Sequence, residues 1–194
     1  LELHDAKEYG SILNVTEVDF EALYSRLDKI KEDISLFATA AQSELRPLIE
    51  VAEAMAQRYH TVVTNPPYMG NGGMSQKLND YVKAHFPDSK SDLFAVFMER
   101  CSTLTAKKGF QGMITQHAWM FLESFEKLRI KMLHHDFVNM VHLGAHAFEE
   151  IGGEIVQTVA FVCSKRINDP TNGKYIRLTA FDDAARKEIE FSNA

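Results

Sequence analysis

The feature that most constrains the fold is a short apolar segment that ends in two consecutive prolines. Residues 61–64 are Thr-Val-Val-Thr, and β-branched residues of this kind favour a buried β-strand. Pro66 and Pro67 stop the strand, because proline lacks the N–H that continues a ladder and fixes φ at about −65°. The strand therefore ends near Asn65, and a glycine-rich loop over residues 69–74 follows it.

Helical and strand-like patterns alternate along the chain, which predicts an α/β fold. Residues 17–58 have the periodicity of two helices or one bent helix. After them we expect strands at 60–64, 110–115, 137–143, 155–164 and 174–178, and helices at 78–84, 92–107, 119–135 and 182–191. Helical crossovers make the first three strands parallel, whereas the short link before 155–164 favours an antiparallel hairpin with 137–143.

Composition narrows the class of protein. The 194 residues are 45% apolar and 25% charged, as in an ordinary globular domain. Two cysteines exclude a disulfide scaffold, and the eight histidines show no metal-ligand spacing, so no metal is expected. No apolar run is long enough for a membrane span and no secretory signal is visible, which indicates a soluble cytoplasmic protein.

The net charge of −6 argues against a general nucleic-acid coat, but the charge is unevenly spread. Residues 1–64 carry six Lys and Arg against twelve Asp and Glu, residues 65–135 nine against six, and residues 136–194 six against nine. A mildly basic middle can face phosphate groups, although ordinary variation along a solvated surface gives the same pattern.

The end of the first strand has the chemistry of an amine-binding site. Ligands of open α/β sheets bind at the carboxyl ends of strands. The stiff proline turn leaves a carbonyl free to accept a hydrogen bond, and Asn65 adds a side-chain acceptor. Tyr68 offers a flat ring for stacking. Two acceptors beside such a ring suit an exocyclic amine such as adenine N6; a turn that merely ends a strand is the alternative.

Asn65-Pro66-Pro67-Tyr68 resembles the catalytic motif of S-adenosylmethionine-dependent amino-methyltransferases, above all the N6-adenine DNA methyltransferases. The likeness continues, in order and spacing, from about residue 59 to 165. It includes residues 92–99, 108–120, 143–148 and 156–162. Residues 88–94, together with Met69 and Gly70, most resemble the adenine methyltransferases of BREX phage-defence systems (the PglX type) or related restriction-modification enzymes.

This resemblance implies the carboxyl-terminal half of a Rossmann-like class I methyltransferase sheet, with parallel strands, a closing antiparallel hairpin and a helical segment before them. Residues 1–58 would be a mostly helical lead-in, residues 59–165 the catalytic half-domain, and residues 166–194 the start of a following segment. The family's glycine-rich cofactor loop has no match in the chain, so we expect a fragment of a larger enzyme, inactive alone.

The resemblance also implies roles for individual residues. Asn65 and the Pro66 carbonyl would hold the amine of a flipped-out adenine, while Tyr68 and Phe148 would stack on its two faces. Asn65, Phe97 and Asp5 would bind S-adenosylmethionine. For Phe148 and Phe97 the alternative is a role as core residues, and for Asp5 it is an ordinary surface carboxylate.

The whole enzyme implied is a site-specific DNA methyltransferase of restriction-modification or phage defence. Its partners would be double-stranded DNA and other subunits of the defence system, with no membrane. Two alternatives stay open: methylation of another amine, in protein glutamine or an RNA base, and a non-catalytic methyltransferase-like binding module.

Overall fold

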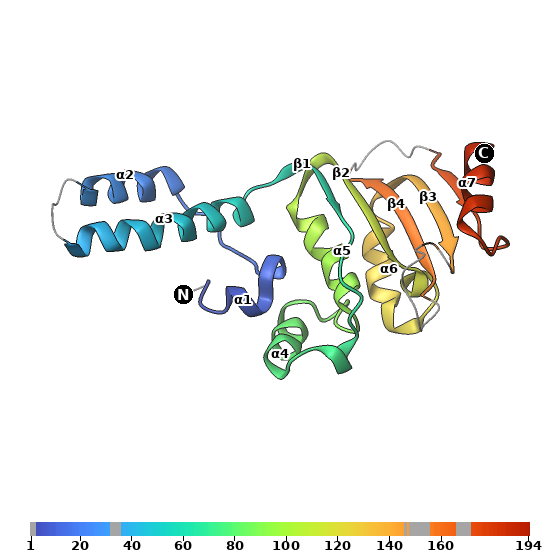
Figure 1. The fold of residues 1–194 in the computed structure, drawn as a ribbon, viewed down its shortest axis with the longest axis horizontal. Coiled ribbons are helices and arrows are strands. Elements are labelled where there is room, and N and C mark those ends of the chain that lie inside the picture. Colours follow the sequence, from blue (N-terminus) through green and yellow to red (C-terminus); the bar gives the residue numbers. More distant parts are fainter. Residues whose placement is uncertain (1–2, 32–35, 146, 148–155, 166–171) are drawn as a thin grey trace. The chain divides into compact units, whose positions relative to one another are not determined.

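The computed structural model describes residues 3–31, 36–145, 147, 156–165 and 172–194. The chain forms two compact units, Leu1–Arg58 and Tyr59–Ala194 (Figure 1). That residues 59–165 form a catalytic half-domain stays a prediction. Among the helices described, none has the length and apolar character needed to cross a lipid bilayer.

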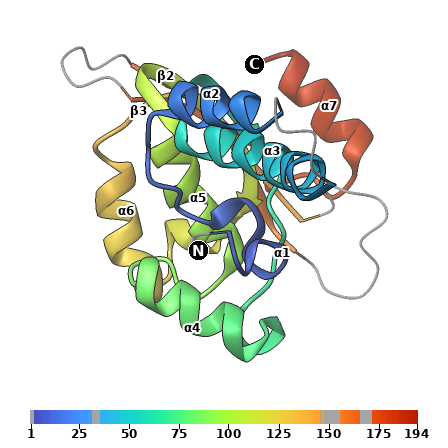
Figure 2. The same cartoon turned by 90° about the vertical axis from the view of Figure 1, so that its left-hand side faces the viewer.

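The first unit is a helical hairpin with a short lead-in. It contains α1 (Ala6–Tyr9), a 3₁₀ turn (Gly10–Ile12), α2 (Phe20–Lys31) and α3 (Leu36–Ala56). α2 and α3 lie side by side, as Figure 2 shows. Arg46 pairs with Asp28 at 2.8 Å, and the Tyr24 hydroxyl donates to Glu53 Oε2 at 2.7 Å. Polar contacts thus tie the two helices together, and the prediction of helices over 17–58 is confirmed.

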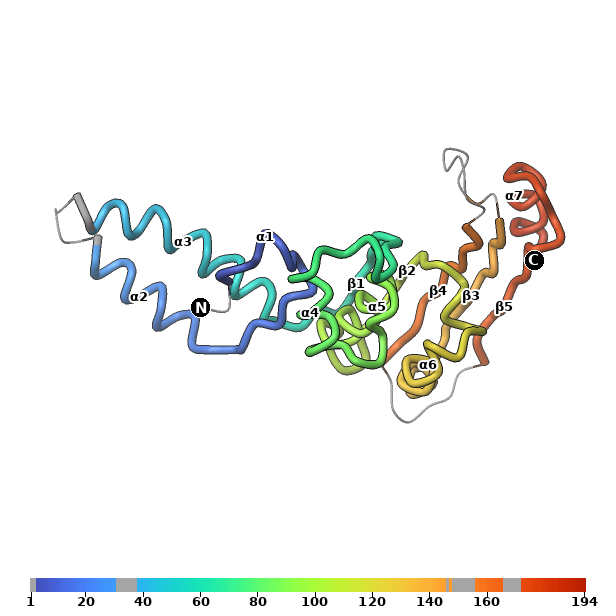
Figure 3. Tube along the Cα trace, turned by 90° about the horizontal axis from the view of Figure 1, so that it is seen from below, coloured from blue at the N-terminus to red at the C-terminus, as the bar shows by residue number. Residues whose placement is uncertain are grey.

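The second unit is built on one five-stranded sheet. Its strands are β1 (Tyr59–Thr64), β2 (Thr105–Gln116), β3 (Asp136–Gly144), β4 (Thr158–Ser164) and β5 (Lys174–Arg177). They follow one another in the order β1-β2-β4-β3-β5 (Figure 3). β1 is parallel to β2, β4 is antiparallel to both its neighbours, and β5 is parallel to β3. The α/β class and the antiparallel hairpin are therefore confirmed, and β1 forms one edge. β5 joins this sheet, and the assignment of 166–194 to a following segment stays a prediction.

One face of the sheet is covered by helices and holds the core. The helices of this unit are α4 (Gln76–His85), α5 (Leu93–Leu104), α6 (Glu126–Met132) and α7 (Ala184–Ser192). α5 packs on β1 and β2, and its Phe94 is fully buried among side chains that include Met113 of β2 and Phe161 of β4. Val62 of β1 packs against this core, because alternate residues of a strand point to opposite faces.

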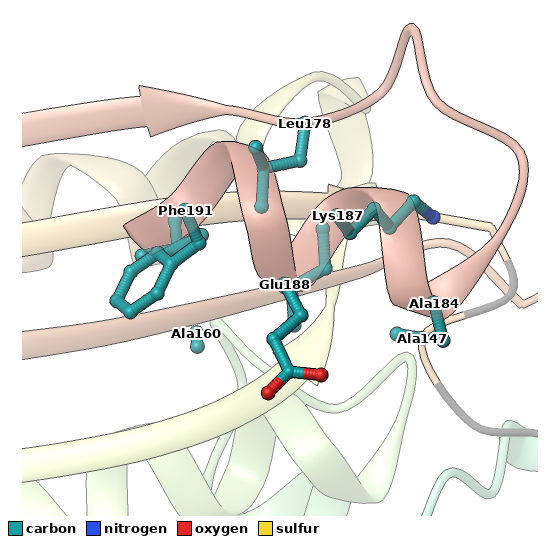
Figure 4. A pocket seen from close by; sticks show the side chains of 9 residues that line it. Ala147, Ala160, Leu178, Ala184, Lys187, Glu188 and Phe191 are labelled. Atoms are coloured by element: carbon teal, nitrogen blue, oxygen red, sulfur yellow. The ribbon is translucent and has the colours of Figure 1, made fainter. Parts of the chain in front are cut away.

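The opposite face is only partly covered. Val63, next to Val62 on β1, is 74% exposed. α7 lies over β3 and β4, where it leaves a hollow of about 320 Å³ (Figure 4). Lys187 of α7 is only 5% exposed and its Nζ donates to the carbonyl of Ala145. The two faces of the same sheet are thus completed to different degrees.

The continuous helix predicted over 119–135 is wrong. The chain instead makes 3₁₀ turns at His117–Met120 and Glu123–Phe125 before α6 begins. Trp119 is buried and its Nε1 donates to Thr115 Oγ1 at 3.1 Å, which holds the ring in the core. Arg129 then donates to the carbonyls of Trp119 and Leu122. The Leu122 carbonyl also accepts from the Phe125 amide at 3.2 Å, and the Arg129 side chain adds a charged donor to both carbonyls, which stabilises the break.

β2 begins at Thr105, before the predicted start at 110, because the chain passes directly from α5 into an extended segment. The pairing with β1 is irregular there: Tyr59 pairs with Thr105, whereas Thr61 pairs with Phe110. A Cβ on Gly109 would lie 2.8 Å from the carbonyl oxygen of His60. Glycine at 109 thus permits the close approach of the two strands.

Candidate active site

β1 delivers the proline motif to the carboxyl edge of the sheet. Thr64 pairs with Met113 of β2, so Asn65 is the first residue beyond the paired segment. The side chain of Asn65 is exposed, whereas Pro66 is buried. Asn65 also lines a hollow of about 360 Å³ that extends over the less covered face of the sheet. The turn is therefore anchored by a buried ring and presents an amide to solvent.

Tyr68 is held by contacts at both ends of its side chain. Its hydroxyl donates to the carbonyl of Ile114 at 3.4 Å, and its ring meets the Phe94 ring edge-on at a centroid distance of 6.2 Å. Burial raises the pKa of Tyr68 to about 12. The phenol is therefore neutral at physiological pH, and its chemistry is that of a fixed aromatic ring with a hydroxyl donor rather than a base.

The other predicted site residues are distributed over the chain. Phe97 lies one turn after Phe94 on α5, half-buried against the core. Asp5 belongs to the first unit, where its Oδ1 lies 3.1 Å from His4 Nδ1. Phe148 lies outside the described residues. The structure therefore brings Asn65, Pro66, Pro67 and Tyr68 together next to α5, and the roles of Asp5 and Phe148 stay predictions.

A cluster of three rings at the same edge of the sheet was not anticipated. His117 directly follows β2, and its Nδ1 lies 2.9 Å from Nε2 of His142 on β3. Phe121, which is 62% exposed, contacts both histidine rings. Burial lowers the pKa of both histidines. The sequence contains one clue to this cluster, because both histidines lie at or near the carboxyl ends of predicted strands.

In the part of the chain that the structure describes, no three His, Cys, Asp or Glu side chains gather as ligands for a metal ion. Besides the two histidines, Asn65 and Tyr68 supply an amide and a phenol at this edge of the sheet. This is a set of hydrogen-bonding groups beside an aromatic ring. It suits a planar ligand that carries an amino group.

The family of Eco57I restriction-modification methylases matches residues 6–148. An adenine-specific methyltransferase PglX from Lacticaseibacillus casei (strain Zhang) is 52% identical over 153 residues, which are 79% of this chain. An adenine-specific methyltransferase BrxX from Escherichia coli O9:H4 (strain HS) is 44% identical over 161 residues, which are 81% of this chain. In both cases the chain spans only 13% of the relative's length.

Two solved structures of proteins bound to DNA have a similar fold. DrdV in complex with DNA matches 75% of this chain and 17% of its own, with a TM-score of 0.56 and 15% identity. The ATP-dependent Type ISP restriction-modification enzyme LlaBIII bound to DNA matches 78% of this chain and 12% of its own, with a TM-score of 0.54 and 13% identity. The methyltransferase fold expected from the sequence is confirmed, and the chain belongs to the Eco57I restriction-modification methylase family.

Proposed function

We propose that this chain is the catalytic half of a DNA methyltransferase that transfers the methyl group of S-adenosylmethionine to adenine N6. The observation that carries the proposal is the exposed amide of Asn65 beside a buried Pro66 at the carboxyl end of β1. The family match and the adenine-specific relatives favour adenine as the target. Because the chain spans only a small part of those relatives, the activity of the whole protein is part of the proposal.

Two hydrogen-bond acceptors, Asn65 Oδ1 and the Pro66 carbonyl, would make adenine N6 a better nucleophile. In free adenine the N6 lone pair is delocalised into the ring, which makes the amine a poor nucleophile. Asn65 Oδ1 and the Pro66 carbonyl would each accept one N–H, which fixes the amino group and directs its lone pair toward the methyl donor. The N–C bond forms as the S–C bond of the donor breaks, and N6 then loses a proton to solvent.

Tyr68 would hold the target ring. A base must leave the duplex to reach the edge of the sheet, at a cost of roughly a few kcal/mol. Stacking on an aromatic side chain contributes about 1–3 kcal/mol per base in single-strand binders, so Tyr68 and Phe148 together would offset that cost. Tyr68 is suited to this role because its contacts with Ile114 and Phe94 fix the plane of its ring.

S-adenosylmethionine would supply the methyl group as a cosubstrate. Phe97 fits its adenine ring, since the half-buried side chain keeps part of its surface accessible on α5. Asp5 is the proposed acceptor for the adenine amine. No glycine-rich turn of the kind expected for the methionine half is found in the sequence. We therefore assign that half of the binding site to no residue of this chain.

The test is binding and methyl transfer, measured on this chain and on a version extended upstream by about one domain. We expect calorimetry to detect S-adenosylmethionine binding only in the extended version. Asn65→Ala in that version should lower tritiated methyl transfer to DNA by roughly 100-fold. Asn193→Ala, an exposed amide directly after α7, is the matched control and should leave transfer unchanged.

The outcomes that would contradict the proposal are distinct. Unchanged methyl transfer by Asn65→Ala would exclude the amine-holding role. Transfer to RNA or to a protein amine in preference to DNA would exclude the proposed target. Tight cosubstrate binding by the short chain would show that its pocket is complete within residues 1–194. Failure of both versions to bind would favour a non-catalytic binding module.

A further inference from the structure

The segment that follows the catalytic motif is joined to the start of α5 by backbone pairing. The Leu93 amide donates to the Met69 carbonyl at 3.0 Å, and the Asn71 amide donates to the Ser91 carbonyl at 3.3 Å. Gly70 and Asp92 form an isolated antiparallel bridge between these bonds. Residues 69–71 and 91–93 therefore lie side by side, and Asp92 is the central residue of the second segment.

The carboxylate of Asp92 reinforces this junction through one oxygen atom. Asp92 Oδ1 accepts from the Met69 amide at 3.0 Å and from the Phe94 amide at 3.2 Å. The second bond makes Asp92 the N-cap of α5. Burial raises the pKa of Asp92, and the backbone donors, that of Phe94 first, act in the opposite sense. A capping residue normally serves only its own helix, whereas this one also holds the residue next to Tyr68.

The same two partners of Asp92 lead directly to the site. The Met69 amide belongs to the peptide bond that follows Tyr68. Phe94, whose amide is the other donor, is fully buried and meets the Tyr68 ring edge-on. The backbone and the ring of Tyr68 are therefore both positioned relative to the first turn of α5. Phe97, the proposed cosubstrate contact, lies on that helix as well.

We propose that Asp92 is a positioning residue for methyl transfer, because its Oδ1 fixes the catalytic turn of residues 65–68 to α5. The residue touches neither substrate; it sets the distance between the ring that stacks on the target base and the helix that faces the cosubstrate. This inference rests on the proposed function for its effect on catalysis. Its structural part, the coupling of the turn to α5, can be tested without any activity.

Three substitutions separate the two bonds. Asp92→Asn keeps an oxygen acceptor of the same length and should behave like the native residue. Asp92→Ser keeps a capping hydroxyl for the Phe94 amide, but the shorter side chain does not reach the Met69 amide as well. Asp92→Ala removes both bonds. Asp183→Ala is the control, because Asp183 caps the remote helix α7 by accepting from the Arg186 amide at 2.7 Å.

The first measurement is amide hydrogen exchange by mass spectrometry on the 194-residue chain. With Asp92→Ser, exchange in the peptide that contains residues 66–75 should become about tenfold faster, as expected for loss of a hydrogen bond to a charged acceptor. Peptides from β3 and β4 should not change, and Asp92→Asn should restore most of the protection. Asp183→Ala should affect only α7.

The second measurement is steady-state kinetics in the upstream-extended version used to test the proposed function. We expect Asp92→Ser to lower kcat by roughly ten- to a hundredfold with little change in the KM for S-adenosylmethionine, as for a misplaced reacting group. Asp183→Ala should leave kcat unchanged, so a general loss of helix capping is excluded as the cause.

Two results would overturn the inference. Native-like exchange and kcat in Asp92→Ser would show that the bond to Met69 positions nothing. Faster exchange throughout the sheet, with no rescue by Asp92→Asn, would reduce Asp92 to a residue needed only for folding. If instead Asn65→Ala leaves methylation intact, the proposed function fails while the exchange result on Asp92 still stands.

Discussion

The two faces of the sheet in the second unit differ in how far each is packed by the chain itself. On one face α5 and its neighbours bury Phe94 completely, and Tyr68 packs against that cluster. On the other face Val63 is 74% exposed and α7 covers only part of the sheet (Figure 4). The proposed catalytic turn is attached to the packed face through Tyr68 and Asp92. Its geometry should therefore depend on α5 far more than on the other face.

The largest effect is expected from shortening one side chain on each face of the sheet. Phe94→Ala should lower the free energy of unfolding by about 3–5 kcal/mol, because it leaves a cavity in the packed face. Val63→Ala, on the same sheet, should change it by less than about 0.5 kcal/mol. Urea denaturation followed by circular dichroism measures both. A large cost at Val63 would show that the second face is packed as well.

Alanine substitutions at two glycines of β2 make the same comparison, with smaller expected changes in the free energy of unfolding. Gly109→Ala should cost about 1–3 kcal/mol, since its Cβ would lie 2.8 Å from the His60 carbonyl oxygen. Gly112→Ala would place its Cβ 3.6 Å from Val63 Cγ2, an ordinary contact on the open face. We expect the Gly112 variant to be neutral or slightly more stable. If Gly109→Ala and Gly112→Ala destabilise the chain equally in the same denaturation assay, the contrast between a crowded and an open position is wrong.

The smallest expected effect is a pH dependence from three half-buried histidines. Burial lowers the pKa of His117, His135 and His142. The unfolded chain then binds more protons than the folded one as the pH falls below about 6.5, so stability present above that pH is progressively lost. The loss should be on the order of 1 kcal/mol or less, because solvent screens these partly exposed rings.

Denaturation curves at pH 7.5 and 5.5 measure this loss, with His142→Gln as the variant and His134→Gln, at an exposed position, as the control. The His142 variant should show the weaker pH dependence. A steeper dependence in that variant, or the same reduction in the control, would place the titrating groups elsewhere.

The sequence predicts the strand β1 and the proline turn that follows it, because the signals are local. A β-branched strand followed by two prolines specifies both the strand and its end, wherever the rest of the chain lies. The broken helix at 117–125 could not be predicted in this way. Its cause is that Trp119 enters the core and Arg129 binds carbonyls ahead of its own helix, and local periodicity carries neither fact.

The contact between Asp92 and the catalytic turn could not be predicted from the sequence for a related reason. A cap at Asp92 is predictable, since Asp before an apolar helical run is a common helix start. Its bond to Met69, 23 residues away, depends on the path of the intervening loop and helix. Likewise the place of β4 between β2 and β3 requires tertiary pairing that no local pattern contains.

The pairing of β1 with β2 has a consequence for the order of folding. Pairing of these strands closes the loop of residues 65–104 at an entropy cost, and the ladder between β2 and β4 closes a loop of comparable length. β1 differs in being an edge strand, so it gains ladder contacts with β2 alone in return for that cost. We therefore expect β1 to dock late, so that Val62→Ala accelerates unfolding and leaves the refolding rate nearly unchanged in stopped-flow experiments. A slowed refolding rate would place β1 in the folding nucleus. Late docking means that most of the sheet is assembled before the proposed catalytic turn, which follows β1, reaches its final position.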